Sequence, residues 1–115
     1  MRRIVRSKYG VRTDAAGKLA RTVDGILFAS LKEAKRYREL VLLTKAGEIF
    51  GLERQPVFTL YAKRGGAIGI YKADFRYNDK VWNIIVEDVK GFKTPLYRWK
   101  KKHVEAQYGI TIREV

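Results

Sequence analysis

The stretch Ile84-Ile85-Val86-Glu87-Asp88-Val89-Lys90-Gly91 contains a short apolar run that ends in charged residues and a glycine. Its β-branched residues favour a strand from Ile84 to Val89. Asp88 and Lys90 are two residues apart, and residues at this spacing lie on the same face of a strand. The stretch therefore predicts a strand whose end presents a carboxylate and an ammonium group side by side.

Two earlier segments predict further strands. Gln55-Pro56 leads into Val57–Tyr61, and Ile68–Tyr77 alternates between apolar and polar side chains as strands do. Lys63-Arg64-Gly65-Gly66 is a basic turn between them. Asp74 interrupts the alternation of the later segment, so it places a second carboxylate on a neighbouring strand.

The connection between the last two strands decides whether the two carboxylates meet. A two-residue turn at Asn78-Asp79 would pair Asp74 with Asn83 and leave Asp88 about 17 Å away, since a strand rises by about 3.4 Å per residue. A metal ion shared by both carboxylates therefore requires a longer loop, at about residues 78–83.

Two helices accompany the strands. Ser30 followed by Glu33 is a capping-box pattern, and Gly47 ends that helix as a C′ glycine. The range Thr94–Tyr108 predicts a second helix, which opens with a threonine N-cap and a proline in the first turn. A final strand follows at Ile110–Val115. The order helix, three strands, helix, strand predicts a mixed α/β fold of sheet and helices.

Composition indicates a nucleic-acid partner. Twenty-five Lys and Arg against twelve Asp and Glu give a net charge of +13 on 115 residues, and a field of this sign attracts polyanions. The absence of cysteine excludes disulfides and thiolate zinc sites. No apolar run approaches the ~18–20 residues of a membrane span, and the charged N-terminus leads into no signal peptide, so we expect a cytoplasmic protein without a membrane partner.

The basic residues concentrate in two segments. Residues 1–22 show little periodicity and predict a mobile basic arm, with a turn at Asp14–Gly17, in front of a nuclease domain at 23–115. In the second helix, basic residues surround Tyr97 and Trp99, which either stack on bases or pack the core. The expected DNA-binding residues are Arg2, Arg3, Arg6, Lys8, Lys93, Arg98, Lys101 and Lys102.

Asp74, Asp88 and Lys90 are residue types that suit phosphodiester hydrolysis. Two carboxylates hold a hard cation such as Mg²⁺ or Mn²⁺ and leave water positions open. The metal lowers the pKa of a bound water, and the lysine orients that water or stabilises developing negative charge. Alternatively, the Asp-x-Lys pattern only places two charged side chains on the solvent-exposed face of a strand, where charged residues usually lie. The protein is then a non-enzymatic DNA-binding module.

Asp74 followed by Asp88-Val89-Lys90 resembles the signature of PD-(D/E)XK nucleases, with Ala73 in place of the proline. A longer ordered pattern, from about Ser7 to the C-terminus, resembles a family of small phage-encoded endonucleases. Its residues are Asp24-Gly25, Phe28, Ser30, Glu33-Ala34, Tyr37, Leu40, Gly47-Glu48-Ile49, Gln55-Pro56, Asp74-Phe75, Glu87-Asp88-Val89-Lys90-Gly91, Thr94 and Tyr97. The resemblance implies a restriction-endonuclease-like core with a central mixed sheet flanked by helices. It also implies Asp74 and Asp88 as metal ligands and Lys90 as the catalytic lysine.

Three further polar residues are candidates for the site. Glu33 matches the acidic residue that often completes such sites as a catalytic group and metal ligand, although its position after Ser30 equally suits a helix cap. Gln55 either hydrogen-bonds near the site or simply enters a strand. Glu87 faces away from Asp88, and we expect it to support the site through a salt bridge or hydrogen bond.

The sequence thus predicts an endodeoxyribonuclease dependent on Mg²⁺ or Mn²⁺, with a role in phage recombination or replication in the host cytoplasm. Branched DNA such as a Holliday junction is a candidate substrate. Symmetric cutting of two strands needs two sites, and twofold dimers are the commonest oligomers, so we expect a homodimer. A resolvase with an RNase H-like site is a rival, but its several carboxylates need no strand Asp-x-Lys pair, so Lys90 argues against it.

Overall fold

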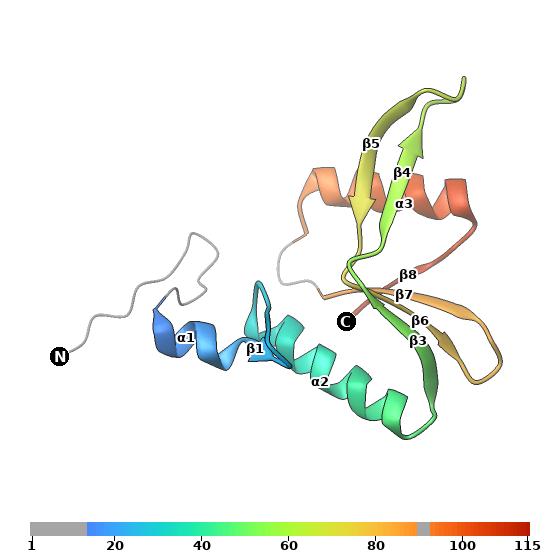
Figure 1. Cartoon of the computed structure of the whole chain (residues 1–115). Helices are drawn as coiled ribbons and strands as arrows, with labels where there is room; N and C mark the ends of the chain where they lie inside the picture. The colour runs from blue at the N-terminus through green and yellow to red at the C-terminus, as the bar shows by residue number, and fades with distance from the viewer. Residues whose placement is uncertain (1–13, 90–92) are drawn as a thin grey trace. The chain divides into compact units, whose positions relative to one another are not determined.

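The computed structural model describes residues 14–89 and 93–115 and divides the chain into two compact units, Met1–Leu42 and Leu43–Val115. This division does not coincide with the boundary at 22/23 expected between an arm and a domain. The first unit contains α1 (Ala15–Ala20), β1 (Thr22–Val23), β2 (Ile26–Leu27) and most of α2 (Leu31–Lys45) (Figure 1).

The segment around Asp14 is helical, so the expectation of a turn within an irregular arm is wrong there. The Asp14 side chain accepts a hydrogen bond from the Gly17 backbone N–H at 2.9 Å and caps α1. Two consecutive alanines follow the cap, and alanine has the highest helix propensity. A helix of six residues is too short to produce a clear apolar periodicity. Arg2, Arg3, Arg6 and Lys8 lie outside the described residues.

The capping signals around α2 are confirmed. The Glu33 backbone N–H donates to Ser30 Oγ at 3.1 Å, so Ser30 is the N-cap. At the other end Gly47 adopts a φ of 75°, which a glycine reaches without steric cost. Phe28, just before the helix, is buried and its ring lies 5.0 Å from that of Tyr37. This contact belongs to the small core of the first unit.

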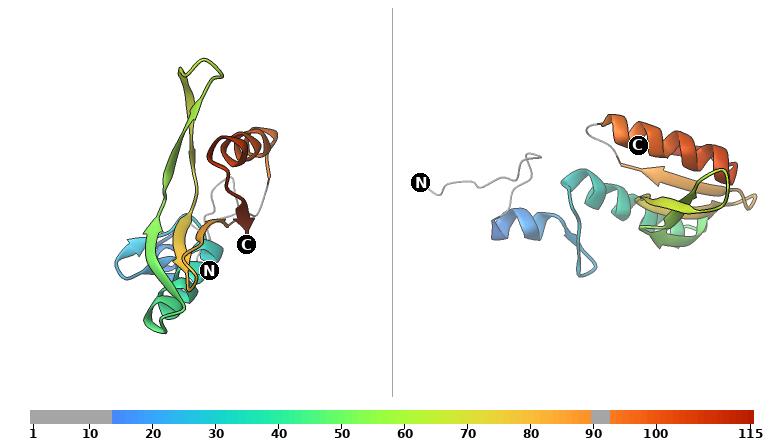
Figure 2. Two further views of the ribbon diagram at one scale, coloured as in Figure 1. Left: turned by 90° about the vertical axis from the view of Figure 1, so that its right-hand side faces the viewer. Right: turned by 90° about the horizontal axis from the view of Figure 1, so that it is seen from above.

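The second unit is built on a mixed four-stranded sheet in the order β3-β6-β7-β8. The first three strands are antiparallel, and β8 is parallel to β7. A two-stranded hairpin, β4-β5, projects from it (Figures 1 and 2). The mixed α/β fold class is therefore confirmed. The elements are β3 (Ile49–Arg54), β4 (Val57–Tyr61), β5 (Ala67–Lys72), β6 (Phe75–Asp79), β7 (Ile84–Asp88), α3 (Pro95–Tyr108) and β8 (Ile112–Glu114).

One bent ribbon connects the hairpin to the sheet. Arg54 pairs with Phe75 in β3-β6, and Val57 pairs with Lys72 in β4-β5. Both pairs follow the same register, because the two residue numbers add up to the same value in each. Two backbone hydrogen bonds continue that register across the junction: Gln55 N–H to the Asp74 carbonyl at 2.9 Å and Ala73 N–H to the Pro56 carbonyl at 3.1 Å. The hairpin is thus a continuation of the central sheet.

The bend corrects two expectations. Ile68–Tyr77 is not one strand, because its first part pairs only with β4 and its last part pairs with β3 and β7. The strand β3 was not expected, since three of its six residues are charged or glycine and its burial does not alternate strictly. Gln55 adopts a positive φ of 52° and precedes a proline, which ends β3 and starts the hairpin in a new direction.

The loop between β6 and β7 meets the condition for a shared carboxylate site. The strands end at Asp79 and resume at Ile84. Asp79 Oδ1 accepts the backbone N–H groups of Val81 and Asn83 at 3.0 and 2.9 Å, and these bonds shape the loop. The bond from Asn83 is the main reason that the pKa of Asp79 is lowered. The resulting register places Phe75 opposite Glu87, and Asp74, just before Phe75, donates its backbone N–H to the Glu87 carbonyl, so Asp74 lies at the end of β7 beside Asp88.

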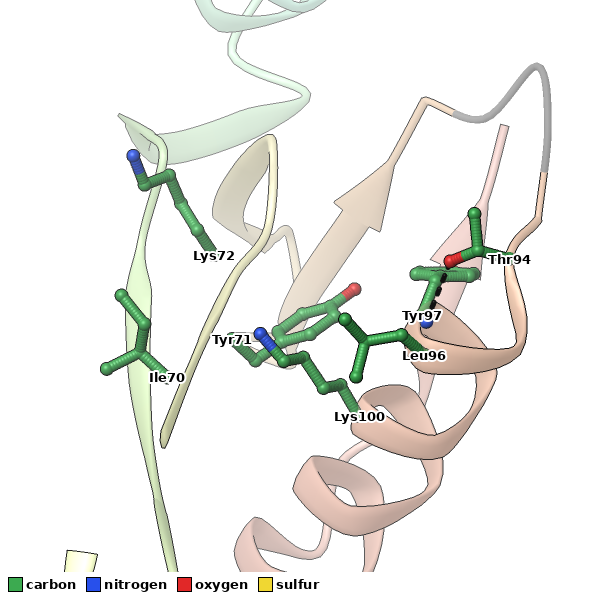
Figure 3. A pocket seen from close by; sticks show the side chains of 7 residues that line it. All are labelled: Ile70, Tyr71, Lys72, Thr94, Leu96, Tyr97 and Lys100. Carbon is green, nitrogen blue, oxygen red and sulfur yellow. Dashed lines mark hydrogen bonds between the residues drawn. The ribbon is translucent and has the colours of Figure 1, made fainter. Parts of the chain in front are cut away.

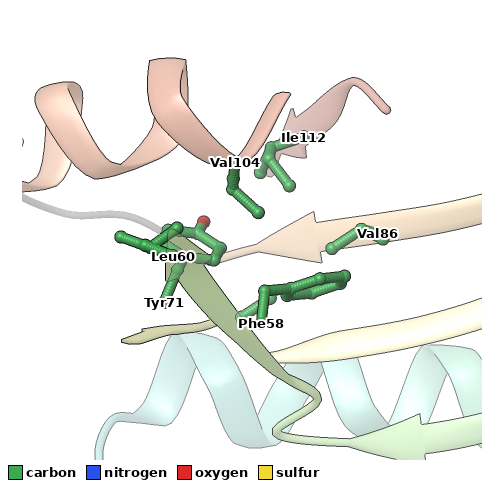
Figure 4. Close-up of a cluster of buried hydrophobic side chains, with 7 residues drawn as sticks. Phe58, Leu60, Tyr71, Val86, Val104 and Ile112 are labelled. Carbon is green, nitrogen blue, oxygen red and sulfur yellow. The ribbon is translucent and has the colours of Figure 1, made fainter. Parts of the chain in front are cut away.

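The main core of the second unit lies between α3 and the strands. Leu60 from β4, Val86 from β7 and Val104 from α3 are at most 1% exposed, and they pack with Phe58, Tyr71, Ala73 and Ile112 (Figure 4). The predicted Thr94 cap begins α3, and the left-handed Gly109 ends it. Within residues 14–89 and 93–115, every helix falls short of the length and apolar character needed to cross a membrane.

Candidate functional site

Asp74 sits in the bend of the ribbon, and three hydrogen bonds position it. Its backbone N–H donates to the Glu87 carbonyl at 3.1 Å, and its carbonyl accepts from Gln55. Its carboxylate Oδ2 accepts the Val89 backbone N–H at 2.7 Å. A carboxylate that accepts a backbone N–H forms a strong, charge-assisted hydrogen bond. The side chain of Asp74 is thereby held beside the end of β7.

Asp88 is the last residue of β7 and is fully buried. Asp88 lies beside Asp74, because the two residues that flank it both hydrogen-bond to Asp74: the Glu87 carbonyl accepts the Asp74 backbone N–H, and the Val89 N–H donates to the Asp74 carboxylate. It also shares a face with Val86, whose neighbours in the core include Val104 of α3. The structure therefore brings Asp74 and Asp88 together on the side of the sheet that α3 covers.

A third carboxylate beside this pair was missed in the sequence. Glu114 of β8 pairs with Asp88 in the parallel register, so the two side chains lie on the same face. Lys93 Nζ and Lys101 Nζ contact the Glu114 carboxylate at 2.8 and 2.6 Å. No sequence signal identifies Glu114, because the register of a parallel pair depends on the whole crossover through α3.

The charges around Glu114 are strongly coupled. The hydrogen bond from Lys101, followed by that from Lys93, lowers the pKa of Glu114 to about 2. The same hydrogen bond raises the pKa of Lys101, and the negative charge of Asp88 adds to this effect. Burial raises the pKa of the Tyr97 phenol, as do the charges of Asp88 and Asp74. Lys101 and Tyr97 thus lie within the electric field of the carboxylate pair.

Glu114 is expected to make stability sensitive to acid. The folded pKa of Glu114 lies below its ordinary value of 4.5. Ionised Glu114 therefore adds to the free energy of unfolding above pH 4.5, and this contribution is lost as the pH falls towards about 2. Thermal melting followed by circular dichroism should show Glu114→Gln less stable than the wild type near pH 7. The difference in melting temperature between the two proteins should narrow as the pH falls from about 5 to about 3. A difference that stays constant over this range would contradict the ion-pair assignment.

Glu87 lies on the opposite face, as its place next to Asp88 requires. It is fully buried and accepts a short hydrogen bond from the Tyr77 hydroxyl. Arg113 Nη1 lies 3.9 Å from Glu87 Oε2 and 3.4 Å from the Tyr77 hydroxyl oxygen. This cluster joins β6, β7 and β8 behind the carboxylate pair, which agrees with a supporting role for Glu87.

The remaining basic candidates differ in their surroundings. Lys101 lies on the inner side of α3, at helical spacing from Tyr97 and Val104, and its charge is engaged by Glu114. Arg98 and Lys102 are exposed on the same helix. Of these three predicted DNA-binding residues, Lys101 is therefore already paired with a carboxylate. Lys90, the predicted catalytic lysine, lies outside the described residues.

Gln55 and Glu33 occupy different settings. The Gln55 backbone holds Asp74, so this residue acts at the site through its main chain. Glu33 belongs to the first compact unit, where it is 8% exposed in the first turn of α2. The cap contact of its backbone N–H with Ser30 is present, and its role as a metal ligand stays a prediction.

Glu33→Gln separates the two roles of this residue. Glutamine keeps the size and hydrogen-bonding capacity that a helix cap needs but is a weaker ligand for a hard cation. If Glu33 is a ligand, DNA cleavage should fall while the melting temperature stays unchanged. Retained cleavage with a lowered melting temperature would instead assign Glu33 to the helix alone.

A cavity of about 360 Å³ lies beside the carboxylate pair, between β5 and the first half of α3. It is lined by Ile70, Tyr71, Lys72, Thr94, Leu96, Tyr97 and Lys100. In Figure 3, Leu96 and Lys100 extend from α3 towards Tyr71 of β5. Lys72 is two residues from Asp74, and the charges of both carboxylates raise the pKa of Tyr97. The cavity therefore supplies cationic and aromatic groups next to the site.

The carboxylate pair has the donor chemistry of a magnesium site. Among the described residues, no group of three or more His, Cys, Asp or Glu is arranged to hold a metal ion. Mg²⁺ is nevertheless commonly bound by one or two carboxylates together with water and substrate phosphate oxygens. Asp74 and Asp88 provide two such carboxylates on one face of adjacent strands, so they fit this cation.

Comparison with known proteins identifies a family but no activity. Residues 6–113 match the family described as "Protein of unknown function (DUF1064)". No curated protein and no solved structure matches the chain significantly. The chemistry of the carboxylate site is therefore the available guide to function.

Proposed function

Because the chain belongs to the DUF1064 family, whose description names no activity, we propose a function from its site: a metal-dependent endonuclease with a PD-(D/E)XK-like core that hydrolyses DNA. The observation that carries the proposal is the hydrogen bonding of Asp74 to Glu87 and Val89, the residues on either side of Asp88, which holds the Asp74 carboxylate beside Asp88 at the end of β7. A second support is the net charge of +13, which favours a phosphodiester polymer as the substrate.

In this proposal Asp74 and Asp88 would hold Mg²⁺ or Mn²⁺, which when bound supplies an activated water and charge neutralisation at the scissile phosphate. The Val89 N–H fixes the orientation of Asp74, and burial fixes that of Asp88. Lys90, which the sequence predicts on the same face as Asp88, is assigned to orient the attacking water or stabilise the developing charge. Lys100, at the neighbouring cavity, would receive a phosphate next to the cleaved bond.

A non-enzymatic DNA-binding module is the second candidate, and burial argues against it. That alternative requires Asp88 to be a solvated surface charge, yet Asp88 is 0% exposed. Burying a carboxylate costs free energy unless hydrogen bonds or opposite charges compensate it, so a carboxylate without a function normally lies in solvent. Sites with buried acidic groups are frequently functional.

Incubation with four DNA forms tests the proposal. Supercoiled, linear, single-stranded and four-way branched DNA are each incubated with the full chain, in Mg²⁺ and in EDTA. We expect cleavage only in Mg²⁺, and faster cleavage of branched DNA if the protein is a junction resolvase of phage recombination. Binding of every form without cleavage in Mg²⁺ or Mn²⁺ would establish the binding-module alternative.

A further inference from the structure

We propose that the β4-β5 hairpin is an arm that lies in the major groove of duplex DNA and extends along it from the cleavage site. The inference rests on the proposed function in placing DNA at the Asp74–Asp88 pair. It adds a second contact surface for DNA, formed by β4, β5 and the turn between them.

The hairpin is held in place from two directions. At its base, the ribbon register continues without interruption into the central sheet. Along its outer edge, Gln107 of α3 accepts the Tyr61 backbone N–H at 3.0 Å and donates to the Thr59 carbonyl at 2.8 Å. The Tyr108 hydroxyl also donates to the Thr59 carbonyl, at 2.7 Å. These side chains satisfy the backbone groups of β4, which prevents another strand from pairing there.

The two faces of the hairpin differ in burial. Phe58, Leu60 and Tyr71 form the face packed under α3. The opposite face carries large apolar side chains that are half exposed, namely Val57 at 55%, Tyr61 at 44%, Ile68 at 51% and Ile70 at 50%. Exposed apolar groups clustered on one surface commonly mark a binding site.

Basic residues surround this exposed face. Lys63 and Arg64 lie at the tip, and Lys72 lies near the base. Within residues 14–89 and 93–115, these three residues form no ion pair. Backbone hydrogen bonds from Ala62 to Gly66 and from Gly65 to Ala62, together with a φ of +93° at Gly65, close the turn tightly. The tip therefore presents two cations on a compact turn.

This combination fits duplex DNA. The major groove of B-DNA is wide enough for a two-stranded ribbon, and apolar side chains there contact thymine methyl groups. Cations at the tip and base would neutralise the flanking phosphates. Double-stranded RNA fits less well, because its major groove is too deep and narrow for side chains to read.

The length of the arm gives a spacing along the DNA. Asp74 lies at the base, seven positions after Ala67, and this stretch spans about 23 Å at a strand rise of about 3.3 Å per residue. B-DNA rises about 3.4 Å per base pair, so the tip would contact phosphates about seven base pairs from the cleaved bond.

The test compares two double variants of the full chain. Lys63→Ala with Arg64→Ala removes the tip charges, and Lys45→Ala with Lys80→Ala removes two exposed lysines elsewhere in the same unit. Binding to a fluorescent duplex is measured by anisotropy in EDTA at several salt concentrations. We expect the tip variant to lower the slope of log affinity against log salt by up to about 1.8, at about 0.9 per phosphate contact, and the control to lower it much less.

A second readout uses Mg²⁺ and linear duplexes. If the arm contacts DNA, the wild type needs about seven base pairs of duplex on the arm's side of the cleaved bond, so it should not cut closer than this to that end. The tip variant should cut closer to that end. Equal salt slopes for both variants, or a wild-type slope in the tip variant, would overturn the arm. So would a change of mass by light scattering in the tip variant, which would make the hairpin a protein interface. Because binding is measured in EDTA, absence of cleavage would count against the nuclease and not against the arm.

Discussion

Replacement of Asp88 by asparagine is expected to abolish DNA cleavage while leaving DNA affinity unchanged or slightly higher. Asparagine has the shape of aspartate but lacks the negative charge that a hard cation requires. Removing one preorganised electrostatic group from an active site commonly costs about 10²–10³ in rate. Asp74→Asn should behave likewise, because its carboxylate faces the end of the same strand. Single-turnover cleavage in Mg²⁺ and anisotropy in EDTA measure the two quantities.

A matched control separates the site from general charge effects. Glu53 lies on β3 and forms an ion pair with Arg76 at the surface of the sheet. Glu53→Gln removes one carboxylate outside the pair and should cleave at the wild-type rate. If Asp88→Asn is too unstable to purify, the partly exposed Asp74 still allows the test. Wild-type cleavage by a folded Asp74→Asn or Asp88→Asn protein would contradict the assignment.

Leu60→Ala is expected to cause the largest loss of stability. Leu60 is fully buried between the hairpin and α3. Truncation of a buried leucine to alanine costs about 2–5 kcal/mol, through lost burial and the cavity that remains. Domains of this size are usually stable by about 5–15 kcal/mol, so a large share would be lost. Urea unfolding followed by circular dichroism measures the change.

Val57→Ala is the control for this prediction. Val57 lies on the same strand but on the opposite face, where it is 55% exposed. Substitutions at exposed positions usually change stability by less than about 0.5 kcal/mol. Equal losses in the two variants would show that α3 does not pack on the hairpin as described.

Local signals predicted the two long helices, α2 and α3, and the residue types of the carboxylate pair. Ser30 and Thr94 mark helix starts because their hydroxyl oxygens accept a backbone N–H group of the first turn that has no partner within the helix. Asp74 and Asp88 were predicted together from residue types and a resemblance. Their meeting depended on a loop that Asp79 organises through its own neighbours. These features are encoded within a few residues of where they act.

The features that were missed depend on distant parts of the chain. Alternation across Ile68–Tyr77 continues through the bend, so nothing local shows that its two halves pair with different strands. Glu114 reaches Asp88 only because the crossover through α3 sets the parallel register. Lys101 looked like a surface charge, and its partner lies 13 residues away in the chain. Such contacts follow from tertiary packing and leave no short-range pattern.

The most direct measurement of the central claim is plasmid cleavage by wild-type and Asp88→Asn proteins purified in parallel. Supercoiled DNA is incubated with each protein in Mg²⁺ and in EDTA, and the products are separated on agarose. The account predicts nicked or linear DNA only with the wild type in Mg²⁺. Intact plasmid with the wild type in Mg²⁺ and in Mn²⁺, or equal cutting by both proteins, would contradict it.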